Sequence, residues 1–474
     1  MKRILLWLMV LVIIISMIAV FSFVGCKAPV EEAAPAEEEA AAAGETTAAE
    51  TTKAATETTS GEPVKLVVWW WGEQEAPGLE NWVKESVDLY QKENPNITIE
   101  VVLQTTEGLI PSFRAAAAAK EGPDIQYFWQ GTFMMDDIML GYLAPISDYV
   151  DQEEIDHWIR GDKELEYGGK IYAVPFYYSV STLAYNKSIF KEAGLDPSNP
   201  PATWEDLLNA CEKIKAVGYI PISAGGKDMF AANFLFSFFG CQYADSIADI
   251  MKPCVGEAKY TDPDYAEFWK KMIELKEKGY LNDDYNSLDF YQGQELFTSK
   301  KSAMTLNILS GAVGFIKALG DDLAVMTTMP KWGNGSKAGS IQMHLKSLGL
   351  TSWSKHPKEA VDFLKFLHSP DRLNTMYAAS GAWPADNRVD FSSIKNEIEK
   401  APSERVKNEE LFIFGRCFIP NLVATEGLGQ GMQSLFSGEK ADVLAQKMVE
   451  IVEKWQLQDP ELSKKYVEWY DSIK

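Results

Sequence analysis

The chain has 474 residues, of which 46% are hydrophobic, and a formal net charge of −23. So strong a negative charge argues against nucleic acid or an anionic membrane surface as a partner. The length exceeds what a single hydrophobic core usually serves, so we expect a globular part with two domains.

A basic start and a long apolar run open the chain. Lys2 and Arg3 precede residues 4–25, and Cys26 follows at once. Such a run after a basic start is typical of a secretory signal, which is not part of the fold. Because its end, Val-Gly-Cys, is similar to the lipobox of bacterial lipoproteins, we interpret residues 1–26 as a lipoprotein signal peptide with Cys26 as the lipid-attachment site. An uncleaved signal anchor is the alternative.

Residues 27–62 are rich in Ala, Glu and Thr and contain no aromatic side chain. They cannot bury enough apolar surface to offset the entropy of ordering, so we expect this segment to be disordered. Nine Glu against two Lys make it repel itself and extend. We interpret it as an acidic tether between the membrane and the globular part, which carries a net charge of about −18.

Alternating strands and helices are predicted at the start of the globular part. The apolar run 64–71 suits a strand that is buried on both faces of a parallel sheet. The next segments are predicted as helix 79–93, strand 97–103, helix 108–120 and strand 125–129. Ligands bind beyond the carboxyl ends of strands in such sheets, so the loops of interest are 72–78, 104–108 and 129–132.

Helix caps can be predicted farther along the chain. Ser188 is expected to cap a short helix. Thr203 stands three residues before Asp206, which predicts a capping box with a carboxylate. Residues 432–456 predict a pair of amphipathic helices that is split at Gly438.

Several segments resemble one protein family. They are GYLAPISDY (141–149), GGKIYAVPFYYSVSTLAYNKSIFKEAGL (168–195), NPPATWEDLLNACEKI (199–214), SKHPKEAVDFLKFLHSPDRL (354–373) and SGAWPADNR (380–388). In this order they are similar to extracellular solute-binding proteins of ABC transporters, in the family-1 group that includes maltodextrin-binding proteins. The resemblance covers essentially all of residues 64–474. It implies an α/β fold of the type II periplasmic-binding-protein kind, with two lobes and a ligand cleft between them.

The resemblance also implies how the chain divides between the lobes, which hinge crossovers would join. The implied crossovers lie near residues 173–178, near 324–330 and near Trp383. The first lobe would comprise residues 63–175 and 331–383, and the second lobe residues 176–330 and 384–474. Such lobes close on a ligand like a hinged clamp.

Sugar recognition needs flat aromatic faces for the apolar side of a pyranose and planar polar groups for its hydroxyls. Trp71 and Glu73, at the end of the first predicted strand, meet this need, although core packing is the alternative for the tryptophan. The remaining candidates rest on the family resemblance or on their place in loops near the cleft. They are Trp129, Gln130, Tyr178, Ser179, Asp228, Asn233, Asn307, His344 and Trp383.

No sequence pattern indicates catalysis or a bound metal. The adjacent aspartate pairs point apart rather than converge as glycosidase carboxylates must, and GxSxG, HExxH and CxxC motifs are missing from the sequence. Cys241 and Cys254 suit either a disulfide or two buried thiols.

We therefore expect an extracellular substrate-binding lipoprotein of an ABC importer. It would capture a mono- or oligosaccharide and deliver it to a membrane permease, acting as a monomer at the cell surface or in the periplasm without a cofactor. The alternatives are a binding protein for a non-sugar solute, such as a polyol phosphate or polyamine, and a signalling receptor. A secreted glycoside hydrolase is a further alternative, of a different class.

Overall fold

The computed structural model describes residues 62–106, 108–159, 163–309, 312–389, 398 and 412–474. The predicted signal peptide with Cys26, and the tether up to residue 61, lie outside the described residues. Among the helices of the described part, none is long and apolar enough to cross a membrane.

The first five predicted elements are confirmed. They are β1 (Val64–Trp70), α2 (Leu79–Glu93), β2 (Ile97–Leu103), α3 (Leu109–Ala119) and β3 (Ile125–Trp129). β1 pairs in parallel with β2 on one side and with β3 on the other. The α2 helix buries the apolar stripe that its spacing predicts, from Leu79 to Tyr90.

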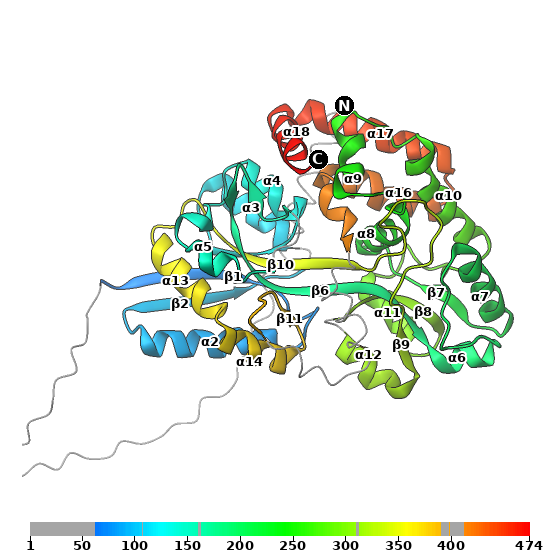
Figure 1. The fold of residues 1–474 in the computed structure, drawn as a ribbon, viewed down its shortest axis with the longest axis horizontal. Helices are drawn as coiled ribbons and strands as arrows, with labels where there is room; N and C mark the ends of the chain where they lie inside the picture. Colours follow the sequence, from blue (N-terminus) through cyan, green and yellow to red (C-terminus); the bar gives the residue numbers. More distant parts are fainter. Residues whose placement is uncertain (1–61, 107, 160–162, 310–311, 390–397, 399–411) are drawn as a thin grey trace, which may run out of the picture. The chain divides into compact units, whose positions relative to one another are not determined.

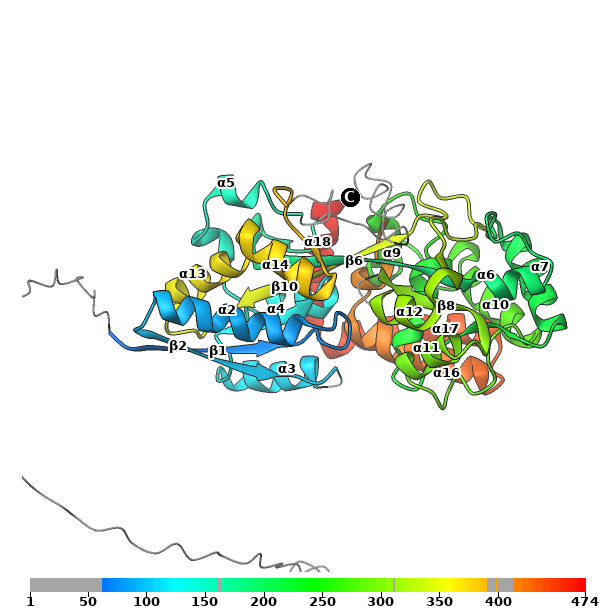
Figure 2. The same cartoon turned by 90° about the horizontal axis from the view of Figure 1, so that it is seen from below.

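One expectation about β1 is wrong, because only one of its faces is fully buried. Lys65 is exposed, and Val67 and Trp69 are only half-buried. Alternate side chains of a strand point to opposite faces of the sheet. On the side opposite α2 lies α3, as Figures 1 and 2 show, and its run of short alanine side chains covers this face incompletely.

A large mixed sheet runs through both lobes in the order β2-β1-β3-β10-β6-β8-β7. Its further strands are β6 (Ala173–Asn186), β7 (Ile220–Ser223), β8 (Ser302–Ile308) and β10 (Gln342–Leu350). β10 is antiparallel to both β3 and β6, and β6 is antiparallel to β8. The long strands β6 and β10 cross from one side of the molecule to the other (Figure 1).

The fold has two lobes, which confirms the predicted fold class. The first lobe holds β1, β2 and β3 with helices that include α2, α3, α4 (Thr132–Met139), α13 (Pro357–Leu367) and α14 (Pro370–Ser380). The second holds β7 and β8 with helices that include α7 (Trp204–Ala216), α10 (Pro263–Glu277), α11 (Phe290–Thr298), α16 (Gln430–Phe436) and α17 (Ala441–Gln458). β6 joins them, because it pairs with β10 from Ala173 to Ser181 and with β8 from Ser181 onward.

One predicted cap and the predicted helix split are confirmed, and the other predicted cap is wrong. The Thr203–Asp206 capping box starts α7, and Gly438 separates α16 from α17 at a φ of 101°. The cap of α6 (Lys187–Glu192) is Asn186 rather than Ser188: the Asn186 side chain accepts a hydrogen bond from the Ile189 amide at 3.0 Å. Ser188 lies inside this helix, because β6 ends at Asn186 and the helix begins directly after it.

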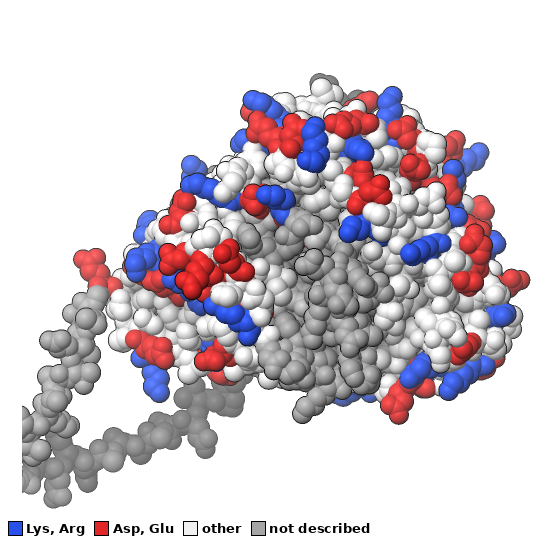
Figure 3. Space-filling model, viewed as in Figure 1, with Lys and Arg blue, Asp and Glu red and all other residues white. Residues whose placement is uncertain are grey.

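The four cysteines of the described part are free and buried, so Cys241 and Cys254 are not bridged. On the face shown in Figure 3, acidic and basic side chains are interspersed, and no continuous basic surface is visible there.

Candidate functional site

A cavity lies between the lobes, beyond the carboxyl ends of β1 and β3. It contains about 600 Å³ of space outside the protein atoms, including its opening to solvent. Aromatic rings from both lobes make up most of its wall. The described lining residues are Trp71, Glu75, Thr106, Trp129, Gln130, Phe133, Phe230, Asn233, Phe234, Phe290, Tyr291, Ile308, His344, Lys346, Phe414 and Cys417.

Three rings of the first lobe stand at or just after the carboxyl ends of β1 and β3. Trp129 meets Trp71 edge-on, with ring centroids 5.2 Å apart, and meets Phe133 at 5.4 Å. The indole N–H of Trp71 donates to Thr106 Oγ1 at 3.0 Å, which fixes the orientation of that ring. Gly131 follows at a φ of 63°, and a Cβ at this position would lie only 2.3 Å from atoms of Cys417. Glycine is therefore needed for the turn that presents Trp129.

The second lobe contributes rings from two helices. Phe230 and Phe234 lie on α8 (Phe230–Leu235), and Phe290 begins α11. Phe234 stacks on Phe290 with ring centroids 4.8 Å apart, and Phe230 faces Trp129 of the first lobe. Asn233, on α8, adds a planar amide to this wall.

Charged and hydroxyl groups form one polar side of the cavity. Lys346 Nζ and Glu75 Oε1 are 2.7 Å apart, and their side chains are only 2% and 5% exposed. The Ser179 hydroxyl donates to the same carboxylate oxygen at 2.9 Å. The Lys346 ammonium also lies 5.5 Å from the centre of the Tyr177 ring. This arrangement joins the loop after β1 to both crossing strands, β6 and β10.

Two further polar side chains face the cavity. The His344 ring stacks on Phe414 at 4.5 Å and is hydrogen-bonded to Ser181. Burial, and then the nearby Lys346, hold the pKa of His344 well below its usual range, so this ring is neutral at physiological pH. Gln130 Nε2 is buried without a hydrogen-bond partner, which leaves a donor for a bound molecule.

The structure brings five of the predicted ligand-binding residues together around this cavity. They are Trp71, Trp129, Gln130, Asn233 and His344. Ser179 contacts two residues of the cavity wall: its hydroxyl donates to the Glu75 carboxylate and accepts from Lys346 Nζ at 3.4 Å.

Two predicted acidic residues serve as helix caps instead of lining the cavity. The Glu73 carboxylate accepts from the amides of Gly78 and Glu80, where α2 begins. The Asp228 carboxylate accepts from the amides of Phe230 and Phe290, each at 3.1 Å. Asp228 thus joins the starts of α8 and α11, the two helices that carry the second-lobe rings.

The remaining predicted residues are buried behind the wall. Tyr178 and Trp383 pack edge-on at 5.6 Å, where β11 (Trp383–Pro384) pairs with β6, and Trp383 is only 1% exposed. Asn307 lies opposite Thr182 in the β6–β8 ladder, and its buried Nδ2 has no hydrogen-bond partner.

Sequence reasoning missed several lining residues. Glu75 and Thr106 stand in loops that the sequence singles out, and Lys346 follows His344 by two residues, so it shares that face of β10. The sequence therefore contains a signal by which these three residues can be recognised as candidates. Phe290 and Phe414 had none, because only the tertiary fold brings them to the cavity.

Residues 414–417 also contribute to the cavity wall, through the side chains of Phe414 and Cys417. The guanidinium of the neighbouring Arg416 lies 3.9 Å from the centre of the Phe133 ring and donates to Thr132 Oγ1 at 2.9 Å and to Asn421 Oδ1 at 2.6 Å. Burial lowers the pKa of Arg416 to about 10, so it stays charged at neutral pH. Its amide donates to Ser237 of the second lobe, so this arginine links the lobes behind the cavity.

A pair of buried carboxylates on α4 extends this network. Asn421 Nδ2 donates to Asp136 Oδ2 at 2.8 Å, and Arg114 contacts both Asp136 and Asp137. Burial raises the pKa of Asp137 to about 7, although Arg114 opposes this shift.

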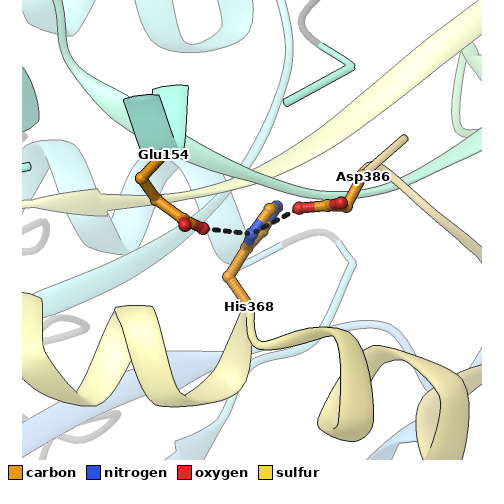
Figure 4. A group of neighbouring side chains, drawn as sticks. All are labelled: Glu154, His368 and Asp386. Atoms are coloured by element: carbon orange, nitrogen blue, oxygen red, sulfur yellow. Dashed lines mark ion pairs between the residues drawn. The ribbon is translucent and has the colours of Figure 1, made fainter. Parts of the chain in front are cut away.

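A separate cluster of titratable groups lies away from the cavity. Figure 4 shows His368, at the end of α13, between Glu154 of α5 (Gln152–Ile155) and Asp386; its Nδ1 is 3.7 Å from Glu154 and 3.5 Å from Asp386. These three side chains are of metal-ligating types, and their ligand atoms lie within 4.8 Å of one another. However, the Arg388 guanidinium bonds both carboxylates, each with an atom pair at 2.6 Å. The cluster is therefore an ion-pair network that fastens the chain after β11 to α5 and α13.

The sequence model of the family described as bacterial extracellular solute-binding protein matches residues 72–372. The multiple sugar-binding protein of Streptococcus mutans is 24% identical over 383 residues, which cover 76% of this chain and 88% of that protein.

Two solved structures are similar in fold. A chitin oligosaccharide binding protein superposes with a TM-score of 0.75 at 22% identity, covering 83% of this chain and 99% of that one. The maltose-bound MalE3 of T. maritima superposes with a TM-score of 0.66 at 18% identity, covering 83% of this chain and 100% of that one. At such identities the likeness establishes a common fold.

Proposed function

Because this chain belongs to the bacterial extracellular solute-binding protein family, we propose that it captures a carbohydrate and delivers it to the permease of an ABC importer. The observation that carries the proposal is the cavity itself, in which aromatic rings of both lobes face one another beside amide, carboxylate and ammonium groups. A pyranose has apolar C–H faces and a rim of hydroxyls, so it matches such a wall.

The placement of the rings supports a clamp that closes on its ligand. A ligand favours the closed state only if it gains contacts there that the open state lacks, which requires groups from both lobes. Trp71, Trp129 and Gln130 come from the first lobe, and Phe230 and Asn233 from the second. In this proposal the two tryptophans stack on the sugar, and the two amides hydrogen-bond its hydroxyls.

We propose the division of the chain between the lobes with the boundaries given above, except over residues 331–341. Residues 331–341 need a different assignment from that expectation, because their hydrogen bonds run to the second lobe. Lys331 bonds through its amide to Ala202, and Gly335 to Gln242. We therefore propose that the first lobe takes up the chain again with β10.

The proposal includes a tethered location. The lipobox-like end of the apolar run supports Cys26 as a lipid anchor, and residues 27–62 would then hold a monomeric receptor at the cell surface or in the periplasm. Two or three acyl chains give stable anchoring where a single chain does not.

A thermal-shift screen tests the proposed function. A ligand that binds only the folded state raises the unfolding midpoint by mass action, so at least one mono- or oligosaccharide should raise it. Binding of polyol phosphates or polyamines alone would favour the non-sugar alternative. Turnover of a chromogenic glycoside would instead indicate a hydrolase, and a neighbouring sensor-kinase gene without permease genes would indicate a signalling receptor.

A further inference from the structure

We propose that the buried Glu75–Lys346 ion pair makes the cavity selective for uncharged sugars over acidic and amino sugars. This inference rests on the proposed function and adds a substrate class to it. The family resemblance points to neither residue. The two side chains meet because the fold brings the loop after β1 against the crossing strand β10.

The pair is built into the wall and is not a chance surface contact. The two groups are 2.7 Å apart and almost fully buried, yet both line the cavity. Ser179 donates to the carboxylate at 2.9 Å, and the Tyr177 ring lies beside the ammonium. These neighbours come from the crossing strand β6, so the pair is fixed from two strands and one loop.

The pair also determines the charge of the site. Among the described residues that line the cavity, Glu75 and Lys346 are the ones that carry a formal charge at neutral pH, since His344 is neutral there. The two charges cancel. An uncharged sugar can use both groups, because the carboxylate accepts from one hydroxyl and the ammonium donates to the next.

A charged sugar is disfavoured by the same arrangement. Its carboxylate or ammonium must leave water for an aromatic-walled cavity, and this desolvation is compensated only if an opposite charge is available. Lys346 is already neutralised by Glu75, and Glu75 by Lys346. A uronate would meet the repulsion of Glu75, and a protonated amino sugar the repulsion of Lys346.

Removing one partner should therefore reverse the preference in a predictable direction. Glu75→Gln leaves the Lys346 ammonium uncompensated, so the variant should gain affinity for uronates. Lys346→Met leaves the Glu75 carboxylate uncompensated, so the variant should gain affinity for amino sugars. The two variants are expected to shift in opposite directions, which a mere loss of stability cannot produce.

The experiment is calorimetric titration of the full chain at neutral pH with matched sugars. The neutral probes are glucose, galactose, mannose, xylose, maltose and cellobiose; the charged probes are glucuronate, galacturonate, glucosamine and galactosamine. The wild type should bind at least one neutral probe at least about tenfold more tightly than any charged probe. In E75Q the ratio of uronate to neutral affinity should rise, and in K346M the ratio of amino-sugar to neutral affinity should rise.

The controls separate this inference from the proposed function. Lys65→Met removes one partner of the exposed Lys65–Glu100 pair and should leave every preference unchanged. If one single variant fails to fold, the other single variant and the wild-type comparison still decide, because each variant is expected to shift in its own direction. Wild-type binding of a uronate or amino sugar as tightly as its neutral counterpart would overturn the inference alone. If no sugar of either kind binds, the proposed function fails.

Discussion

The Phe230 ring meets the Trp129 ring edge-on, with centroids 5.4 Å apart and ring planes at 85°. Trp129 ends β3 in the first lobe, and Phe230 begins α8 in the second, so this contact spans the cavity. A ligand that lies against Trp129 must therefore pass or displace Phe230.

Shortening Phe230 should change the balance between open and closed forms. Phe230→Ala removes a ring contact of about 0.5–1.5 kcal/mol between the lobes, so the empty protein should open more readily. Small-angle scattering should then give a larger radius of gyration for the variant without sugar. An unchanged radius in the empty variant, together with unchanged contraction on sugar binding, would show that this contact has no part in closure.

Trp129 is the most direct test of the proposed site. Trp129→Ala should weaken sugar binding by about 1–3 kcal/mol through lost stacking and burial, with little change in the melting temperature of the empty protein. Trp204 is the matched control, because it is 1% exposed and packs on Phe239, away from the cavity. Trp204→Ala should instead destabilise the fold by about 3–5 kcal/mol. A Trp129 variant that behaves like the Trp204 variant would count against the site.

Asp137 should make the fold less stable as the pH rises. Burial raises its pKa to about 7, above the value of about 4 for an unfolded chain. The stability that comes from burying the neutral carboxyl is complete below the unfolded pKa and is lost as the pH rises through the folded pKa. Asp137→Asn should therefore gain stability relative to the wild type between pH 4 and pH 8. Thermal unfolding at several pH values measures this difference, and a difference that does not vary with pH would contradict it.

Glu154 should show the opposite pH dependence. His368 and then Arg388 hold the pKa of its carboxyl well below its usual range. The stabilisation is present above the unfolded pKa and is lost as the pH falls through the folded one. Glu154→Gln should therefore lower the free energy of unfolding at pH 7, and this difference from the wild type should shrink toward pH 3. Thermal unfolding at several pH values tests this prediction. A stability difference that grows as the pH falls would contradict it.

The tether should be dispensable for binding, because residues 27–62 lack core-forming side chains. A chain that starts at residue 63 should bind sugar with unchanged affinity, and Cys26→Ser should release the receptor from the membrane or leave it unprocessed. A tenfold loss of affinity, about 1.4 kcal/mol, would show that the tether packs on the globular part.

The sequence predicts local structure better than it predicts the site. The periodicity of residues 79–93 gives both the bounds of α2 and its buried stripe, because an amphipathic helix depends on neighbours three or four residues apart. The predicted cap at Ser188 lies two residues from the observed cap, since Asn186 also offers a side-chain acceptor and the strand ends there. The family resemblance supplied the two lobes, which composition alone could not.

The cavity depends on contacts between distant residues, and this limits what a sequence can predict. The family resemblance and the place of Trp129 at the end of a predicted strand both point to this residue as a candidate. Trp383 and Trp129 both stand beside turns in the sequence, yet Trp383 is packed behind Tyr178 and does not line the cavity. The sequence places Lys346 on the same strand face as His344, but it does not link Lys346 to Glu75, because only the fold brings these two groups within 2.7 Å.

The most direct test of the central claim is calorimetric titration of the wild type and of Trp129→Ala with the sugar that most raises the unfolding midpoint. The account predicts saturable binding at one site by the wild type and a loss of about 1–3 kcal/mol of binding free energy in the variant. The account would be contradicted if no carbohydrate binds the wild type, or if the variant binds the sugar as tightly as the wild type does.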